Sequence, residues 1–103
     1  MIKKKKPLTK KKISRSFYKS KEWITLALLT KKLYGRVCMK CGATKGRMNS
    51  DHVKPRSLYP ELALDINNIA ILCRKCNKEK SNKHCTDYRT ETHLKILREF
   101  LTR

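Results

Sequence analysis

The chain has 103 residues, of which 27 are Lys or Arg and 8 are Asp or Glu, so its formal net charge is +19. This length allows one small domain with a limited core, and such domains commonly need disulfides or a bound metal to be stable. The charge says little about the fold but indicates a polyanionic partner, nucleic acid above all. Apolar runs such as LALL at residues 26–29 are far too short for a signal peptide or a membrane span. We therefore expect a cytoplasmic protein with reduced thiols.

A basic, flexible arm is expected at residues 1–19. The first 21 residues carry ten Lys or Arg and no acid. Like charges repel one another there and apolar side chains are too few to form a core, which favours an extended, solvated segment. Such an arm either confers only solubility or localisation, or binds phosphates without reading the bases; the net charge favours phosphates. The arm residues expected to contact nucleic acid are Lys3, Lys4, Lys5, Lys6, Lys10, Lys11, Lys12 and Arg15.

One domain is expected over residues 20–103, with a helix on either side of its centre. The first helix should cover residues 20–34, because Ser20 can cap its N-terminus, Glu22 suits its positive first turn and Gly35 can end it. Its apolar side chains recur at the i, i+3, i+4 spacing of one buried face. A second helix should cover about residues 91–102, where an apolar stripe begins at Leu94. Both helices are expected to pack on the same small core.

Short strands and turns are expected between the helices, in a core at residues 36–84. RVC (36–38) and MNSDHV (48–53) are predicted as extended pieces around a turn made by Gly42 to Gly46. A longer loop at 58–68, with a helical turn near its centre, precedes a brief buried strand, IAIL (69–72). A helix then begins in CRKCNKEKSNK. This order of elements predicts a small α+β fold.

Two CxxC pairs bracket that core. They are formed by Cys38, Cys41, Cys73 and Cys76. Two pairs at this spacing can complete the tetrahedron that Zn²⁺ prefers, and Gly42 permits the tight backbone after the first pair. Four thiolates leave no open position, so the zinc would be structural. The alternative is two unrelated cysteine pairs in a reduced core, which matched spacing disfavours. Cys85 is interpreted as a free thiol.

Three motifs within this segment carry a family resemblance. They are C-x-x-C-G at 38–42, D-H-V-x-P at 51–55 and N-I-A-I-L-C-x-x-C-N-x-x-K at 68–80. From Cys38 to about Lys83 the chain resembles the zinc-clamped HNH endonucleases of the ββα-metal fold, in particular their small phage-type members. The resemblance implies a metal-dependent DNA endonuclease, a nickase or a double-strand cutter, that leaves 5′-phosphate and 3′-hydroxyl ends. It also implies that a phage packaging complex could be a partner, in the host cytoplasm.

The resemblance also implies a role for each residue of the motifs. His52 would be the general base that activates water, which suits an imidazole with an ordinary pKa of about 6.5. Asp51 and Asn77 would offer oxygens to one catalytic divalent ion, which would stabilise the leaving 3′ oxygen. Asn77 stands where the family often has His, and its harder oxygen favours Mg²⁺ or Mn²⁺. Asn68 would hold the ring of His52 in the correct tautomer.

Each motif also has an ordinary interpretation. An Asp-His pair is often solvated, Asn77 could cap a helix, and Asn67-Asn68 could form a turn. Asp51 and His52 should also point to opposite sides of an extended segment, unless the strand ends or twists there. The alternative function is a catalytically silent zinc-ribbon module that binds nucleic acid. Near the site, the Lys residues expected to hold the phosphate backbone are Lys54, Lys75, Lys78 and Lys80.

Overall fold

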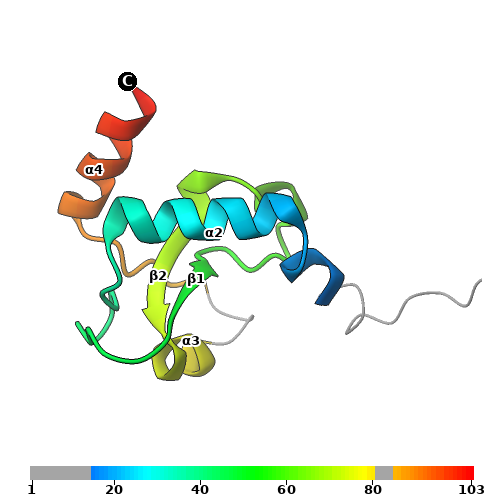
Figure 1. Cartoon of the computed structure of the whole chain (residues 1–103), viewed down its shortest axis with the longest axis horizontal. Helices are drawn as coiled ribbons and strands as arrows, with labels where there is room; N and C mark the ends of the chain where they lie inside the picture. Colours follow the sequence, from blue (N-terminus) through cyan, green and yellow to red (C-terminus); the bar gives the residue numbers. More distant parts are fainter. Residues whose placement is uncertain (1–14, 81–84) are drawn as a thin grey trace, which may run out of the picture.

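The computed structural model describes residues 15–80 and 85–103, so the arm predicted to bind phosphates lies outside the described residues up to residue 14. The elements are α2 (Lys21–Tyr34), β1 (Met48–His52), β2 (Ile69–Cys73), α3 (Arg74–Lys80) and α4 (Glu91–Leu101), with 3-10 turns at Pro60–Leu62 and Ile66–Asn68 (Figure 1). Residues 15–18 are also helical. No helix in this part of the chain is long and apolar enough to cross a membrane.

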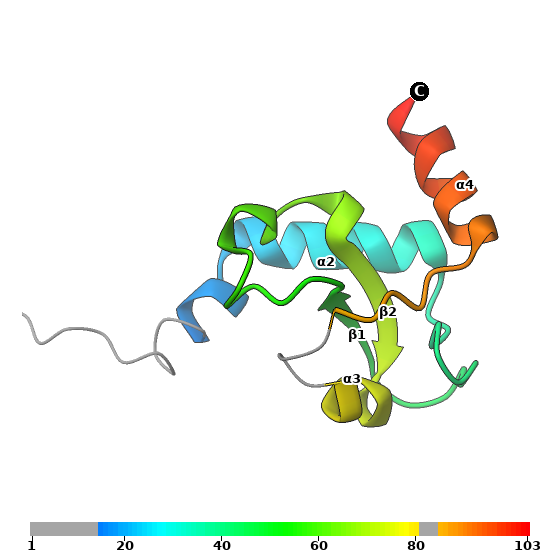
Figure 2. The same cartoon turned by 180° about the vertical axis from the view of Figure 1, so that it is seen from behind.

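The centre of the fold is a two-stranded antiparallel sheet followed directly by a helix. Met48 of β1 pairs with Cys73 of β2, and His52 pairs with Ile69. The apolar residues of β2 are buried without alternation, because α2 and α3 both lie against β2 and its residues Ile71 and Leu72 pack with Cys38 and Cys76. Seen from behind, α3 lies at the end of β2, beneath β1 (Figure 2). The α+β class, the ββα core and the flanking helices are confirmed.

Helix α2 begins and ends where the sequence predicts. The Ser20 hydroxyl accepts a hydrogen bond from the Trp23 amide at 3.3 Å, and Gly35 follows the last turn with φ +82°. The helix is fixed to β1 by hydroxyl groups: Thr30 Oγ1 lies 2.9 Å from Ser50 Oγ, which donates to the Ala27 carbonyl. Thr30 is fully buried although it is polar, so the apolar pattern of the helix did not identify it.

Helix α4 closes the chain at the C-terminal end of α2. Thr90 and His93 form a capping box at its N-terminus, and Leu97 is its buried residue. The segment before it is anchored by Arg89, which pairs with Asp87 and donates to the Asn67 carbonyl at 2.6 Å. Both views place α4 against the end of α2 that is remote from residues 15–18 (Figures 1 and 2). It supports the core without reaching the sheet edge described below.

One predicted element is wrong. Residues 36–38 were expected to be extended beside β1, but they belong to the loop that enters the first CxxC pair. The partner of β1 is β2, and the loop joins the sheet through the Met39 amide, which donates to the Ile71 carbonyl at 2.9 Å. The reason is the position of Cys38, which is buried in the core with Met48, so its backbone must turn toward the other cysteines.

Candidate active site and zinc centre

The four cysteines of the CxxC pairs form one cluster. The sulfurs of Cys38, Cys41, Cys73 and Cys76 all lie within 4.8 Å of one another. A tetrahedral ion with Zn–S bonds of about 2.3 Å needs sulfurs about 3.8 Å apart, and the Cys41 and Cys73 sulfurs are 3.8 Å apart. The cluster therefore fits a structural zinc ion. Cys85 is exposed and lies outside it, as predicted.

Backbone hydrogen bonds prepare the cluster for a cation. The amide of Cys41 donates to the Cys38 sulfur and the amide of Cys76 to the Cys73 sulfur, each at 3.4 Å. Burial acts to raise the pKa of Cys38, but hydrogen bonds outweigh it and lower the pKa to about 6. Burial and the neighbouring thiols raise the pKa of Cys76 to about 12. A positive ion such as zinc would stabilise further thiolates in this cluster.

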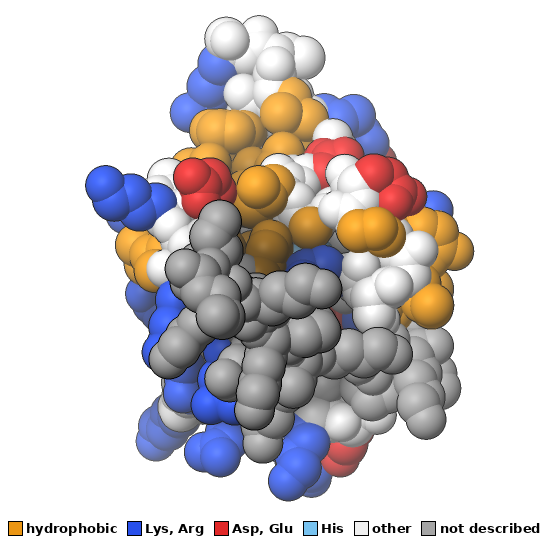
Figure 3. All heavy atoms as spheres, turned by 90° about the vertical axis from the view of Figure 1, so that its right-hand side faces the viewer, with side chains coloured by type: hydrophobic (Ala, Val, Ile, Leu, Met, Phe, Trp, Pro, Cys, Tyr) orange, Lys and Arg blue, Asp and Glu red, His pale blue; other side chains and the backbone are white. Residues whose placement is uncertain are grey.

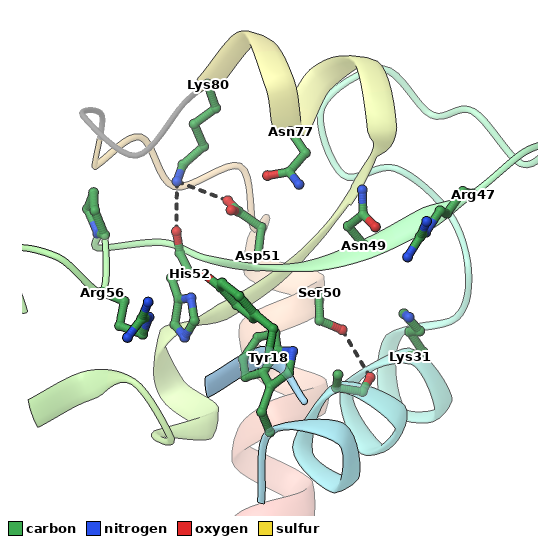
Figure 4. Close-up of a pocket in the computed structure, with 13 residues that line it drawn as sticks. Tyr18, Lys31, Arg47, Asn49, Ser50, Asp51, His52, Arg56, Asn77 and Lys80 are labelled. Carbon is green, nitrogen blue, oxygen red and sulfur yellow. Dashed lines mark hydrogen bonds and ion pairs between the residues drawn. The ribbon is translucent and has the colours of Figure 1, made fainter. Parts of the chain in front are cut away.

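The residues of the Asp-His and Asn motifs meet in a cavity of about 430 Å³. The cavity follows the free edge of β1, between α2 and α3 (Figure 4). Asp51, His52 and Asn77 all line it. As neighbours on a strand, the two side chains point apart: Asp51 points toward Asn77 and Lys80 of α3, and His52 points to the other side of β1, where it stacks on Trp23 of α2 (Figure 4). Both line the cavity because it extends around the free edge of β1.

His52 is held from two sides. Its Nε2 lies 2.8 Å from the carbonyl oxygen of Ala63, and because a carbonyl only accepts, Nε2 carries the hydrogen and Nδ1 keeps a lone pair. Its ring stacks on Trp23 with centroids 4.7 Å apart and 26° between the planes. Burial lowers the pKa of His52, against the opposing effect of the Ala63 hydrogen bond. The ring is therefore a neutral, oriented imidazole at pH 7.

The expected contact between Asn68 and His52 is replaced by another arrangement. The Asn68 side chain accepts from the Lys54 amide at 2.9 Å and donates to the carbonyls of Lys54 and Leu62. These bonds close the loop between β1 and β2, which carries Ala63. Asn68 is 5% exposed and fixes the loop that orients His52, so its influence on the ring is indirect.

Lys80 was predicted to hold phosphate, and its position contradicts this. Its ammonium lies 2.9 Å from Asp51 Oδ2 and donates to the His52 carbonyl at 2.7 Å, with the side chain only 2% exposed. Burial raises the pKa of Asp51, and Lys80 opposes that shift by favouring the carboxylate. From the amino-acid sequence alone, Lys80 is one of several lysines near the site that could lie on the surface. Its position three residues after Asn77 on one helical face was the available signal.

Asp51 and Asn77 provide a donor set that suits a small hard cation. Their side chains point into the same space between β1 and α3 (Figure 4). A carboxylate and an amide carbonyl are oxygen ligands of the kind that Mg²⁺ and Mn²⁺ prefer, and two protein ligands leave positions for water and phosphate. The residues present therefore fit a divalent ion.

Other basic residues near the site fall into two groups, those on the exposed surface and those that line the cavity. Lys54, Lys75 and Lys78 are exposed, as phosphate contacts should be, and the Lys54 ammonium lies 5.3 Å from the ring centre of Tyr59. Further basic side chains line the cavity itself and were not identified from the sequence; they are Lys31, Arg47 and Arg56. Seen from the end of the molecule near the N-terminus of α2, Lys and Arg side chains border the left and lower edges of the face, and hydrophobic side chains gather above (Figure 3).

Replacing Lys80 by Met tests the ion pair. Removing one partner leaves the Asp51 carboxylate, whose side chain is 16% exposed, without its cation, and we expect the free energy of unfolding to fall by about 3 kcal/mol. The double variant Lys80→Met/Asp51→Asn removes both charges and should recover most of that loss. Urea unfolding measures both, with the exposed Lys78→Met as the matched control. Equal losses in the single and double variants would contradict a stabilising pair.

Comparison with known proteins agrees with this geometry. The family model described as HNH endonuclease matches residues 38–83, the segment that contains the zinc cluster, β1, β2, α3 and the three motifs. No curated protein and no solved structure gives a significant match to the chain. Helix α2, which supplies Trp23 and Lys31 to the cavity, lies outside the matched segment.

Proposed function

We propose that this protein is a metal-dependent endonuclease that hydrolyses phosphodiester bonds in DNA, as the match of residues 38–83 to the HNH endonuclease family model suggests. One observation carries the proposal: an oriented neutral imidazole, a buried carboxylate and an amide oxygen line the same cavity. The zinc cluster supports it by joining the loop before β1 to the start of α3. The net charge of +19 suits a polyanionic substrate.

In this proposal His52 is the general base. Its Nδ1 takes a proton from the attacking water, and the imidazolium that forms keeps its Nε2 hydrogen bond to the Ala63 carbonyl. Trp23 covers one face of the ring, so the ring cannot rotate away from the cavity. Asn68 keeps Ala63 in place through its bonds across the loop. The base therefore needs little reorganisation when the proton is transferred.

Asp51 and Asn77 would hold the divalent ion in the cavity. When bound, this ion would supply Lewis-acid stabilisation of the charge on the phosphate and on the leaving 3′ oxygen. Lys80 orients the Asp51 carboxylate and favours its ionised form against the effect of burial. The expected products are 5′-phosphate and 3′-hydroxyl ends. One such centre suffices for a nick, and a double-strand cut requires two centres or two successive nicks.

The test is conversion of supercoiled plasmid to nicked circles by the purified protein, with Mg²⁺ or Mn²⁺ added and without either. We expect nicking only with the ion, because Asp51 and Asn77 alone leave the phosphate charge uncompensated. DNA ligase should reseal the nicks, since it joins 5′-phosphate to 3′-hydroxyl ends. Nicks that ligase cannot close would contradict the proposed direction of cleavage.

The second candidate is a catalytically silent zinc-ribbon module that binds nucleic acid. The Cys cluster and the positive charge would suit it equally well. It gives no reason, however, for a buried Asp51–Lys80 pair beside an oriented imidazole in an open cavity. DNA binding without cleavage across a series of divalent metals would favour this candidate over the nuclease.

A further inference from the structure

The cavity extends well beyond the three proposed catalytic side chains. Lys31 of α2 and Arg47, just before β1, line its other end, and Asn49 lies between them and Asp51 (Figure 4). Asn49 and Asp51 alternate along β1, which places them on the same side of it, and Arg47 directly precedes the strand. The free edge of β1 therefore connects a basic end of the cavity with the proposed reaction centre.

The basic end has no neutralising acid among residues 15–80 and 85–103. The ion pairs in that part of the chain involve other residues, and none includes Lys31, Arg36 or Arg47. Burial lowers the pKa of Lys31, and the nearby charges of Arg36 and Arg47 lower it further. Like charges that gather without a counter-charge repel one another, and an anion bound between them would relieve that repulsion.

The separation of the two ends matches a nucleic-acid strand. Asp51 lies four positions after Arg47, which at the strand rise of about 3.3 Å per residue is about 13 Å. A strand of B-DNA carries one phosphate per about 3.4 Å of helix axis, so the basic end lies up to about four nucleotides from the reaction centre, and fewer in an extended strand. A phosphate bound at the basic end would therefore be a different one from the phosphate at the proposed reaction centre.

We propose that Lys31 and Arg47 form a second phosphate subsite, so that one strand of the substrate lies along the free edge of β1. The scissile phosphate lies at the Asp51 end and a phosphate of the same strand, a few nucleotides away, at the Lys31–Arg47 end. The position of the scissile phosphate rests on the proposed function. The subsite itself depends on α2, which lies outside the segment that matches the HNH family, and it gives this protein a minimum length of bound strand.

A binding experiment without added divalent metal tests the subsite separately from cleavage. The probe is a labelled DNA duplex in which neutral methylphosphonate replaces one phosphate at a time, and fluorescence anisotropy gives the dissociation constant. Lys31→Ala and Arg47→Ala are compared with wild type and with Lys32→Ala, which removes one charge from the exposed neighbour on α2. All four proteins are measured from about 50 to about 200 mM salt.

We expect Lys31→Ala and Arg47→Ala each to weaken binding and to reduce the slope of log K against log salt by about 0.9. Lys32→Ala should change the slope less. One methylphosphonate position, two to four nucleotides from the cleavage point, should weaken wild-type binding and have no further effect on either variant. That loss of additivity identifies the phosphate that the two side chains share.

The proposal is overturned if the two substitutions and every methylphosphonate position act additively, or if Lys32→Ala reproduces their effects. If the protein nicks plasmid but the substitutions and the methylphosphonate positions act additively on binding, the subsite is rejected and the proposed nuclease activity is supported. If the substitutions and one methylphosphonate position act non-additively, but no divalent metal supports cleavage, the subsite is supported and the proposed nuclease activity is rejected.

Discussion

Replacement of His52 by Ala is expected to lower the rate of plasmid nicking by about 10²- to 10⁴-fold, the usual contribution of a general base. The reason is the position of Nδ1, the ring atom left with a lone pair while Nε2 donates to Ala63. Single-turnover nicking with saturating divalent ion measures the effect. DNA affinity should change little, because a neutral imidazole contributes no charge to phosphate binding.

Two controls separate loss of the base from loss of structure. His52 is 5% exposed and stacks on Trp23, so its removal also costs packing; His52→Gln keeps more of the side-chain volume and should be nearly as inactive as His52→Ala. His93→Ala removes an imidazole from α4, outside the cavity, and should nick normally. Full activity in a folded His52→Gln variant would show that His52 is not the base.

The second large effect is expected from Cys73→Ser. Apparent free energies of zinc binding in small zinc domains are about 10–16 kcal/mol, which equals or exceeds the total stability of a typical domain, about 5–15 kcal/mol. We expect the variant to lack bound zinc and to show no cooperative thermal transition. Circular dichroism and elemental analysis for zinc measure the two properties, and a strong chelator should have the same effect on wild type.

Cys85→Ser is the matched control, because Cys85 is exposed and lies outside the cluster. It should bind zinc and unfold as wild type does. Cys38 and Cys76 belong to the buried core, so loss of zinc should open that core and separate α3, with Asn77, from β1. A Cys73→Ser protein that is soluble, free of zinc and fully active would refute a structural role for the cluster.

Features that depend on local chemistry could be predicted from the amino-acid sequence. Ser20 and Gly35 mark the ends of α2 because capping uses only neighbouring groups. The apolar run 69–72 identifies a buried strand, since a continuous apolar segment of this length has to be covered. The CxxC pairs predict a zinc cluster because thiolates are preferred zinc ligands and the two-residue spacing lets both sulfurs of a pair bind one ion.

The surroundings of each functional group, in contrast, follow from the three-dimensional packing of the chain. The hydrogen-bond partner of the His52 ring is the backbone carbonyl of Ala63. Because every residue has a backbone carbonyl, the amino-acid sequence does not indicate which one accepts this bond. The amino-acid sequence suggests that Lys80 is a surface lysine, but α3 packs beside β1 and buries Lys80 against Asp51. Lys31 and Arg47 lie far apart in the chain and meet only because α2 packs against the sheet. Charge and hydrogen-bond partners depend on distance in space, which residue spacing does not encode beyond a few neighbours.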